Sequence, residues 1–315
     1  MKKFNTAVIG VGSLGQHHAR VMSTHPMSEL TFIVDADVTR AETIAKPLKE
    51  NVNISVDYKD IIGKVDCAVI AVPTPYHYAI AKDLLSAGVH CLVEKPFTST
   101  LKEADELIEI AKAKNLVLQV GHIERFNPAF IAATPYIKNP NFIEVNRLGP
   151  YDPRTAHIGV VMDLMVHDLD IILSLVKSPV VSVEAHGSKV LSDYEDIVKA
   201  RLKFENGCVA DVSTSRVSLD RYRRMRVFQP DSYVSIDFGG KAFKVCRKKQ
   251  EVAKAASLAD MEIIKPEVSA GEPLFFEADN FLNCIKNGSR PVVSGTEGRA
   301  AIELAGRVLE SMVLF

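Results

Sequence analysis

Residues 6–18, TAVIGVGSLGQHH, decide the fold of the first part of this 315-residue chain. A short apolar run leads into Gly10-Val11-Gly12-Ser13-Leu14-Gly15, and a segment of helical character follows. In such a loop the first glycine permits a tight turn, the second lets the backbone approach a pyrophosphate, and the third lets the helix pack on the strand. The amino terminus of the helix also attracts the anion. The sequence therefore predicts a dinucleotide-binding loop between a strand and a helix.

Working outward from this loop, apolar runs and helical segments alternate up to about residue 121. Runs such as LTFIVD, DCAVIAV, HCLVE and LVLQV are separated by longer segments of helical period, including 101–114 with its one-sided apolar stripe. This rhythm is typical of a parallel sheet with helices on both faces. We therefore expect an α/β protein whose residues 1–121 form a Rossmann dinucleotide-binding domain.

The rhythm changes after residue 121. Long strand-like runs appear, such as DIVKARLKF and CVADVSTSRV, and some are joined by tight-turn signals such as Asn206-Gly207. Strands joined so closely pair antiparallel. We expect residues 122–315 to form an α+β domain with a large, mostly antiparallel open sheet, ending in helices at 273–285 and 296–314.

An acid follows the second predicted strand, 20 residues after the last glycine of the loop. Asp35 ends LTFIVD, where a carboxylate accepts hydrogen bonds from the adenosine ribose and repels a 2′-phosphate. This placement favours NAD. Arg40 lies close enough in sequence to keep NADP as the alternative.

Bulk composition narrows the class of protein. The formal net charge is −1, 47% of residues are hydrophobic and 24% are charged, as in ordinary soluble globular proteins. No run approaches the roughly 18 apolar residues of a membrane span, and the first apolar run is too short for a signal peptide. Five scattered cysteines without a C-x-x-C pair suit a reducing compartment. We expect a cytoplasmic protein with no nucleic-acid or membrane partner.

A lysine stands at the tip of another predicted strand. HCLVE ends in Glu94-Lys95-Pro96, and the carboxyl ends of strands are where open α/β sheets bind ligands. Pro96 disfavours helical geometry at Lys95 and so keeps this residue extended. On its own, a surface lysine before a proline would be the simpler interpretation.

Taken together, several motifs make the chain resemble the Gfo/Idh/MocA family, the family of glucose-fructose oxidoreductase and inositol dehydrogenase. They are the glycine loop, Asp35, the segment Val72-Pro73-Thr74-Pro75-Tyr76-His77, Glu94-Lys95-Pro96 and Asp163-x-x-x-His167. The resemblance implies a Rossmann domain followed by a domain with a large open sheet, and reversible NAD(P)-linked oxidation of a sugar or cyclitol hydroxyl. It also implies a set of cofactor-binding residues: Gly10, Gly12, Ser13, Leu14, Gly15, Asp35, Val72, Pro73, Thr74, His77, Glu94 and Lys95.

Two segments sharpen the resemblance. Residues 121–129, GHIERFNPA, and 160–168, VVMDLMVHD, look most like a bacterial branch that oxidises the 3-hydroxyl of UDP-N-acetylglucosamine on the way to amide-linked lipid A. The substrate-binding residues expected on this basis are Lys95, His122, Glu124, Arg125, Asn127, Asp163 and His167. An inositol or free-sugar dehydrogenase of the same family is the nearest alternative. A non-catalytic NAD-binding regulator is the alternative from a different class.

The proposed reaction needs a base for the hydroxyl proton and a positive group beside the developing alkoxide. By the resemblance Lys95 contacts nicotinamide and substrate, while Asp163 and His167 serve the reacting hydroxyl. His167 suits the base because the free imidazole titrates near neutrality, and Lys95 stabilises the alkoxide or is itself the base. Asp163 orients the imidazole or holds a neighbouring hydroxyl.

The stretch that carries His167 is expected to be a regular, buried helix. At about 100° per residue, Asp163, His167, Asp170 and Ser174 fall on one polar stripe, while Asp168 stands apart. We therefore expect Asp168 to have a structural partner elsewhere. A metal held by Asp163 and His167 with His122 is an alternative that lacks an indicated fourth ligand, so no metal is expected.

The open face of the predicted second sheet suggests self-association. An antiparallel sheet with one uncovered face invites pairing with another copy. We expect a homodimer or homotetramer formed through that face.

Overall fold

The computed structural model describes residues 3–48, 52–249 and 257–315, and the chain divides into two compact units. Unit 1 comprises the described residues of Met1–Phe126 and Gly271–Arg299, and unit 2 those of Asn127–Ala270 and Ala300–Phe315. Each unit has its own apolar core. The chain thus contains two structural bodies, as its length suggests.

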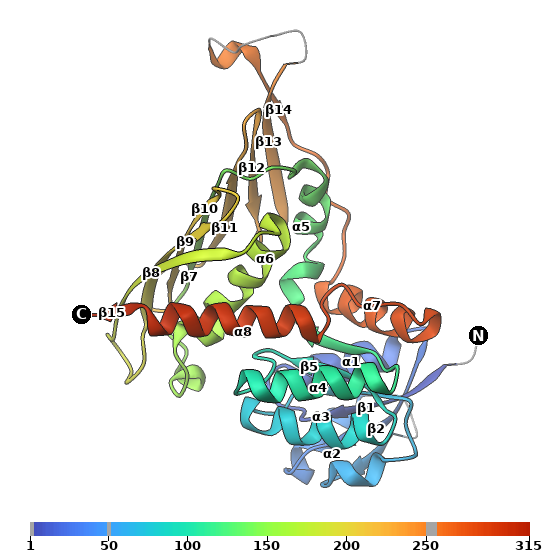
Figure 1. Cartoon of the computed structure of the whole chain (residues 1–315). Helices are drawn as coiled ribbons and strands as arrows, with labels where there is room; N and C mark the ends of the chain where they lie inside the picture. Colours follow the sequence, from blue (N-terminus) through green and yellow to red (C-terminus); the bar gives the residue numbers. More distant parts are fainter. Residues whose placement is uncertain (1–2, 49–51, 250–256) are drawn as a thin grey trace. The chain divides into compact units, whose positions relative to one another are not determined.

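Unit 1 is built on a parallel sheet of six strands in the order β3-β2-β1-β4-β5-β6. Figure 1 labels β1, β2 and β5 of this sheet. All of its neighbouring strands run parallel, and the chain reverses its direction of winding between β1 and β4. The strands are β1 (Phe4–Ile9), β2 (Ser28–Val34), β3 (Asn53–Ser55), β4 (Cys67–Ile70), β5 (His90–Glu94) and β6 (Leu118–Gly121). This is the doubly wound arrangement that the sequence predicts, and its ligand site lies at the carboxyl ends of the strands.

Helices cover both faces of this sheet. They are α1 (Gly15–Thr24), α2 (Val38–Ala45), α3 (His77–Ser86), α4 (Leu101–Ala113) and α7 (Pro273–Asn287), with short turns η1 (Tyr58–Ile61), η2 (Thr74–Tyr76) and η3 (Ile123–Phe126). Residues of α1, α2 and α7 share one core with β1 and β2, and α3 packs beside α4. A complete capping box at Thr100 and Glu103 fixes the start of α4.

Helix α7 packs with unit 1 although it follows the second sheet in sequence. Its buried residues Leu274, Ala278 and Phe281 join the same core as Val8 and Met22. The sequence-based division at residue 121 assigns this helix to the second domain. The observed units therefore differ from that division over residues 122–126 and 271–299.

Unit 2 is built on a sheet of nine strands in the order β14-β13-β12-β11-β7-β10-β9-β8-β15. Most neighbours are antiparallel, and the parallel pairs are β7 with β10 and β8 with β15. The strands are β7 (Phe142–Leu148), β8 (Val180–Ser188), β9 (Ile197–Phe204), β10 (Val209–Ser215), β11 (Tyr222–Phe228), β12 (Ser232–Asp237), β13 (Ala242–Lys248), β14 (Met261–Ile264) and β15 (Met312–Leu314). The predicted large, mostly antiparallel sheet is confirmed.

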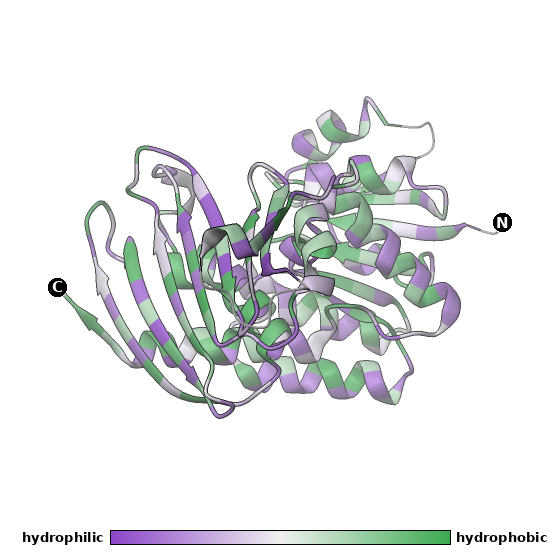
Figure 2. Ribbon diagram, turned by 90° about the horizontal axis from the view of Figure 1, so that it is seen from above, coloured by the Kyte–Doolittle hydropathy of each residue, from purple (hydrophilic) through white to green (hydrophobic). Residues whose placement is uncertain are grey.

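The two faces of the nine-stranded sheet differ in polarity. Along β9, exposed Lys199, Arg201 and Lys203 alternate with buried Val198, Ala200 and Leu202. Figure 2 shows this alternation as purple and green segments along the strands. One face is therefore core and the other carries charge.

Helices of unit 2 cover the apolar face. They are α5 (Pro128–Ala133), α6 (Val166–Val176) and the later part of α8 (Gly295–Glu310), with the short turns η4 (Thr134–Tyr136) and η6 (Val161–Met165). Two further turns of this unit are η5 (Pro153–Thr155) and η7 (Leu258–Asp260). The core joins Leu169 and Ile172 of α6 to Val145 and Val212 of the sheet. Among the described residues, no helix is long and apolar enough to cross a membrane.

Two local expectations need correction. The helix predicted at 296–314 ends at Glu310, and Met312–Leu314 form strand β15, which pairs with β8. The segment before α6 is a π-helical turn, in which the N–H of Val166 bonds the carbonyl of Val161. An i→i+5 turn holds more residues than an α-helical turn, so a constant 100° per residue does not describe the step from Asp163 to His167.

Candidate functional site

The glycine loop has the geometry that phosphate binding requires. Gly10 adopts φ +80°, and a Cβ there would lie 2.8 Å from the carbonyl oxygen of Ala71. A Cβ on Gly15 would come within 1.8 Å of the Gly10 oxygen, so only glycine allows α1 to start here. No atom lies within 4 Å of a Cβ built on Gly12, so the loop is open on that side. The loop and the amino terminus of α1 thus fit a dinucleotide pyrophosphate.

Asp35 follows β2 directly and holds the loop. It is 8% exposed, and its Oδ2 accepts a hydrogen bond from the N–H of Val11 at 2.8 Å. Its Oδ1 accepts from the N–H of Asp37 at 2.9 Å and from Arg40 at 3.4 Å. The carboxylate of Asp35, which is predicted to bind the adenosine ribose, is therefore already oriented by the loop. Arg40 lies beside it.

His77 lies inside the fold. Its Nε2 is 2.8 Å from the carbonyl oxygen of Val72, and its Nδ1 is 3.0 Å from that of Pro96. The side chain is 1% exposed. The His77 ring thus joins the Val72–His77 segment to the Lys95-Pro96 turn, and both ring nitrogens face main-chain carbonyl oxygens.

Glu94 also turns inward, beneath the lysine that follows it. Its Oε2 accepts a hydrogen bond from the main-chain N–H of Lys95 at 3.1 Å. A Cβ on Gly121 would lie 2.8 Å from the Glu94 carboxyl carbon, so β6 approaches this side chain as closely as glycine allows. The half-buried Lys95 is joined to Pro96 by a cis peptide bond. Glu94 therefore positions the lysine turn.

Three buried titratable side chains meet beneath this turn. His18 of α1, Glu94 of β5 and Glu277 of α7 have side-chain N and O atoms within 4.8 Å of one another. His18 Nε2 is 2.6 Å from Glu94 Oε1. Two ligands of one zinc ion stand about 3.4 Å apart at tetrahedral angles, so 2.6 Å fits a hydrogen bond and not two ligands of a shared cation. Sequence reasoning missed this cluster because its members are 76 or more residues apart.

The predicted catalytic stretch lies in unit 2, on η6 and α6. Asp163 is half-buried in the π-helical turn, and His167 is 9% exposed in the first turn of α6. A π-helical turn inside a helix frequently marks a functional site. The structure thus places both residues on one short, irregular stretch of helix.

Asp168 has the structural partner that the sequence predicts. Arg147 of β7 donates from Nε to Oδ2 and from Nη2 to Oδ1, both at 2.8 Å. The two side chains are 4% and 1% exposed. This bidentate ion pair fixes α6 on the sheet, and it removes Asp168 from the candidates for chemistry.

A loop between β8 and β9 holds the start of the catalytic stretch. The main-chain oxygen of Glu195 accepts from the N–H of Val160 at 3.0 Å, and its Oε1 accepts from the N–H of Val161 at 3.1 Å. These bonds satisfy N–H groups that a helix start leaves free. A Cβ on Gly159 would lie 1.9 Å from Glu195 Oε1, so glycine is required beside this cap.

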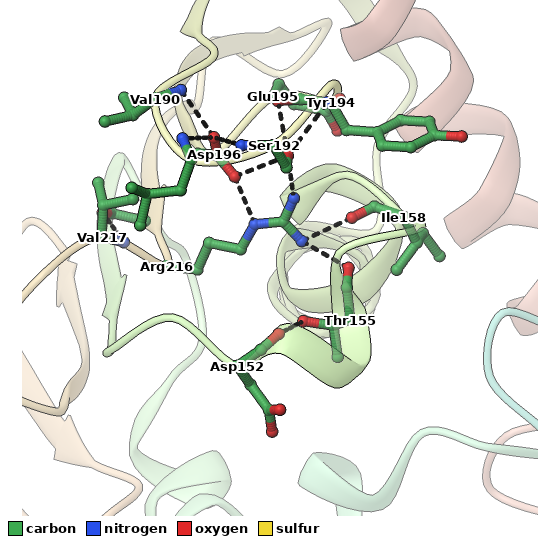
Figure 3. Close-up of polar contacts among 12 residues, drawn as sticks. Asp152, Thr155, Ile158, Val190, Ser192, Tyr194, Glu195, Asp196, Arg216 and Val217 are labelled. Atoms are coloured by element: carbon green, nitrogen blue, oxygen red, sulfur yellow. Dashed lines mark hydrogen bonds and ion pairs between the residues drawn. The ribbon is translucent and has the colours of Figure 1, made fainter.

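An ion pair next to Glu195 ties three loops together (Figure 3). Arg216 donates from Nε to Asp196 at 2.6 Å, from Nη1 to the carbonyls of Thr155 and Ile158, and from Nη2 to Ser192. Both charged side chains are at most 3% exposed. Burial alone would raise the pKa of Asp196, but hydrogen bonds from the N–H groups of Val190 and Leu191 and from Arg216 hold it well below its usual range.

These supporting residues gave little signal in the sequence. Glu195 lies in a polar loop segment, while Asp196 and Arg216 lie at the ends of the strand-like runs DIVKARLKF and CVADVSTSRV, where charged residues are usually exposed. Only Gly159, immediately before an apolar helix and without a turn pattern, hinted at a close approach.

The segment after β6 contains four predicted substrate residues. His122 and Glu124 are buried, and Arg125 is half-buried. Asn127 begins α5, accepting from the N–H of Ala129 at 3.1 Å and donating to the Phe238 carbonyl at 3.2 Å. The amide of Asn127 thus has a capping role in unit 2.

Two hollows in the surface contain none of the predicted site residues. One, of about 580 Å³, lies in unit 2 among Tyr136, Gln229 and Arg247. The other, of about 560 Å³, lies in unit 1 near His90 and Gly288, by the amino ends of β5 and β6. Ligands of open α/β sheets bind at the opposite, carboxyl ends, so neither hollow is the candidate site.

Comparison with known proteins identifies the class. A family model described as the Gfo/Idh/MocA oxidoreductase family, NAD-binding Rossmann fold, matches residues 4–122. A model of the Gfo/Idh/MocA C-terminal domain matches residues 143–231. The chain belongs to the Gfo/Idh/MocA oxidoreductase family. The predicted family, the NAD-binding Rossmann fold and the class of dehydrogenases acting on a CH–OH group are confirmed.

Individual relatives extend over nearly the whole chain. UDP-N-acetylglucosamine 3-dehydrogenase of Acidithiobacillus ferrooxidans is 36% identical, covering 100% of this chain and 99% of its own. A solved structure of that protein has a TM-score of 0.91 at 34% identity, covering 99% and 98% of the two chains. scyllo-Inositol 2-dehydrogenase (NAD⁺) of Bacillus subtilis is 26% identical, over 95% and 91%. Levoglucosan dehydrogenase in complex with NADH has a TM-score of 0.87 at 21% identity, which shows the shared fold.

Proposed function

We propose that this protein is an NAD-dependent dehydrogenase that oxidises the 3-hydroxyl of a UDP-N-acetylhexosamine such as UDP-N-acetylglucosamine. The observation that carries the proposal is the 36% identity, over 100% of this chain, to a protein named for that reaction. The segments 121–129 and 160–168 resemble the same branch. Oxidation of UDP-N-acetylglucosamine at this position supplies a 3-keto sugar to an aminotransferase on the way to amide-linked lipid A.

Unit 1 supplies the residues proposed to hold NAD. The open loop at Gly12, the start of α1 and the oriented carboxylate of Asp35 fit the pyrophosphate and the adenosine ribose. Ser13, Leu14, Val72, Pro73 and Thr74 complete the proposed contacts. When bound there, NAD would supply the acceptor for the hydride of the carbinol carbon.

The remaining chemistry falls to side chains of this protein. We propose that His167 Nε2 or Nδ1 accepts the hydroxyl proton and that the Lys95 ammonium stabilises the alkoxide. Asp163 holds the imidazole or a neighbouring hydroxyl, and His122, Glu124, Arg125 and Asn127 contribute to substrate binding. Lys95 as the base is the alternative assignment.

The decisive experiment is a substrate screen. Purified protein with NAD is mixed with UDP-N-acetylglucosamine, UDP-glucose, free hexoses, and myo- and scyllo-inositol, and NADH formation is followed. We expect turnover with the UDP-N-acetylhexosamine and a 3-keto product by NMR. Turnover with an inositol alone would assign the protein to the inositol dehydrogenases, three of which match 95–97% of this chain at 24–26% identity.

Two conservative variants separate an enzyme from an NAD-binding regulator. Lys95→Met and His167→Asn should each lower kcat by about a hundredfold or more, with NAD affinity changed far less. If both variants turned over normally, the assigned roles would be wrong. If neither the wild type nor any variant turned over any sugar while NAD still bound, the regulatory alternative would gain support.

The charged face of the nine-stranded sheet supports a proposed homodimer or homotetramer. Arg201 pairs with Asp211 there at 2.7 Å, and Arg224 with Asp237 at 3.1 Å. Light scattering at several concentrations tests the assembly, and a monomer throughout would contradict it. All five cysteines are unpaired by disulfides, in keeping with a proposed cytoplasmic location.

A further inference from the structure

We propose that Glu277 keeps its carboxyl proton inside unit 1 and that, in this neutral form, it steadies the His18–Glu94 pair that holds the Lys95 turn. The protonation of Glu277 is argued only from residues of unit 1. The consequence for Lys95 rests on the proposed function.

The burial of Glu277 is complete. Its side chain is 0% exposed, and within the described part of the chain neither carboxyl oxygen has a hydrogen-bond partner. An ionised carboxylate in such surroundings loses its hydration without compensation, and such groups take up a proton instead. A neutral carboxylic acid is therefore the form that this site tolerates.

The neighbours of Glu277 reinforce this conclusion. Glu94 of β5 is the nearest acid, and its carboxylate is stabilised by His18 at 2.6 Å and by the Lys95 N–H at 3.1 Å. Burial raises the pKa of Glu277, and the charge of Glu94 raises it further. Of two acids this close, one ionises and the other retains its proton. The hydrogen bonds identify Glu94 as the ionised one.

Other elements near α7 contribute hydrogen-bond acceptors and charged side chains that already have partners. Gln119 of β6 donates from Nε2 to the main-chain oxygen of Glu277 at 3.0 Å, and its Oε1 is a second buried acceptor without a partner among the described residues. On α1, Arg20 pairs with Glu272 and His25 lies 3.4 Å from Asp279. The turn η3, packed on α7, carries Glu124 and Arg125. A site rich in acceptors favours a donor, and a protonated Glu277 supplies one.

The cluster joins three parts of the proposed cofactor site. His18 follows the glycine loop on α1, Glu94 ends β5 directly before Lys95, and Glu277 comes from the helix that returns to unit 1. Ionisation of Glu277 would place a second negative charge against Glu94 and weaken its hold on His18 and on the Lys95 N–H. Glu277 is thus a positioning residue that acts through Glu94.

Infrared spectroscopy of the wild-type protein tests the proton directly. At pH 7 a carboxylic-acid carbonyl band, shifted by D2O, should be present and should disappear in Glu277→Gln. Glu109→Gln, which replaces an exposed glutamate of α4 in the same unit, is the matched control and should leave the band unchanged. A wild type without such a band at pH 5 to 7 would overturn the proposal whether or not any variant folds.

Proton linkage gives a second, independent readout. The pKa of Glu277 is raised in the folded state, so the unfolded state releases a proton that the folded state keeps. Stability is then lost as pH rises from about 4.5 towards the folded pKa, and the unfolding constant should rise by up to tenfold per pH unit relative to Glu277→Gln. Equal slopes in the two proteins would contradict the proposal. Loss of stability on treatment with EDTA would also overturn it, because a cation would then neutralise the cluster.

The link to Lys95 is read from the pH profile of turnover. At neutral pH, Glu277→Gln should keep kcat within about threefold of the wild type, and its rate should persist to higher pH because glutamine cannot ionise. Glu109→Gln should follow the wild type throughout. An unchanged alkaline limb in Glu277→Gln would reject the positioning role. If no substrate is turned over at all, the infrared and linkage results still decide whether Glu277 holds its proton.

Discussion

Arg147 and Asp168 form a bidentate ion pair between β7 and α6, with both hydrogen bonds at 2.8 Å and both side chains almost wholly buried. Asp168 directly follows His167 in the sequence. A buried acid next to a proposed base is easily mistaken for a catalytic carboxylate. Both oxygens of Asp168 accept hydrogen bonds from the guanidinium of Arg147, so Asp168 serves to fix the helix.

The first prediction concerns this pair. Arg147→Met should destabilise the protein by about 3–5 kcal/mol, because the Asp168 charge stays buried without a partner. Arg147→Met combined with Asp168→Leu should recover most of that loss, since both charges are gone. Urea unfolding measures both, with Arg226→Met as the exposed control because its pair with Glu144 is 39% and 34% exposed. A double variant as unstable as the single one would contradict the account.

The second prediction concerns Arg216. Arg216→Met should cost about 3–5 kcal/mol, because it leaves the Asp196 charge buried and frees the carbonyls of Thr155 and Ile158. Arg201→Met is the matched control. Its bidentate pair with Asp211 lies on the exposed sheet face and should be worth about 0–1 kcal/mol. Equal losses in the two variants would show that the buried network contributes no more than a surface pair.

The same network predicts a response to acid. The folded pKa of Asp196 is depressed, so its contribution is fully present above the unfolded pKa near 3.8 and is lost as pH falls through the folded value. The wild type should therefore lose stability below about pH 4. In Asp196→Asn, titrated in parallel, this component of the acid slope should be absent, and a variant with the wild-type slope would refute the assignment.

The sequence predicts the fold well where the residues that decide it are close together. The glycine loop and Asp35 lie within 26 residues, and each glycine meets the steric demand expected of it. The separation of Asp168 from His167 also follows from helical periodicity, because both residues lie in the regular helix α6. These inferences depend only on local backbone geometry.

Other features depend on contacts that the sequence does not bring together. The π-helical turn at Val161–Met165 changes the phase of the helix without a change in apolar pattern. Glu195 precedes β9 and Arg216 follows β10, yet both contact the segment that leads into that helix. Glu277 belongs to unit 1 although it follows strands β7 to β14 of the second sheet. The apolar residues of Met312–Leu314 fit a continuation of the preceding helix equally well. Only their pairing with β8 identifies them as a strand.

The fourth prediction concerns cofactor choice. Asp35→Ser should raise the KM for NAD by about tenfold or more, because a charged acceptor for the ribose is removed and the N–H of Val11 loses its partner. The ratio of NADP to NAD usage should rise, since Arg40 no longer faces that carboxylate. Asp37→Ser, which keeps a cap for α2, should change this ratio less. An unchanged KM for NAD in Asp35→Ser would remove Asp35 from the cofactor site.

The last prediction concerns Gly159. An added methyl group would stand 1.9 Å from Glu195 Oε1, and Glu195 is 7% exposed, so its carboxylate is closely surrounded and has little room to move aside. Gly159→Ala should therefore cost about 1–3 kcal/mol and displace the cap from the N–H of Val161. Because that cap begins the stretch bearing Asp163 and His167, kcat should fall more than NAD affinity. Gly149→Ala is the control, since a Cβ at that position would have no atom within 4 Å. Adding Glu195→Ser to Gly159→Ala should relieve the clash and cost less than the sum of the single changes, whereas strict additivity would show that residues 159 and 195 act independently.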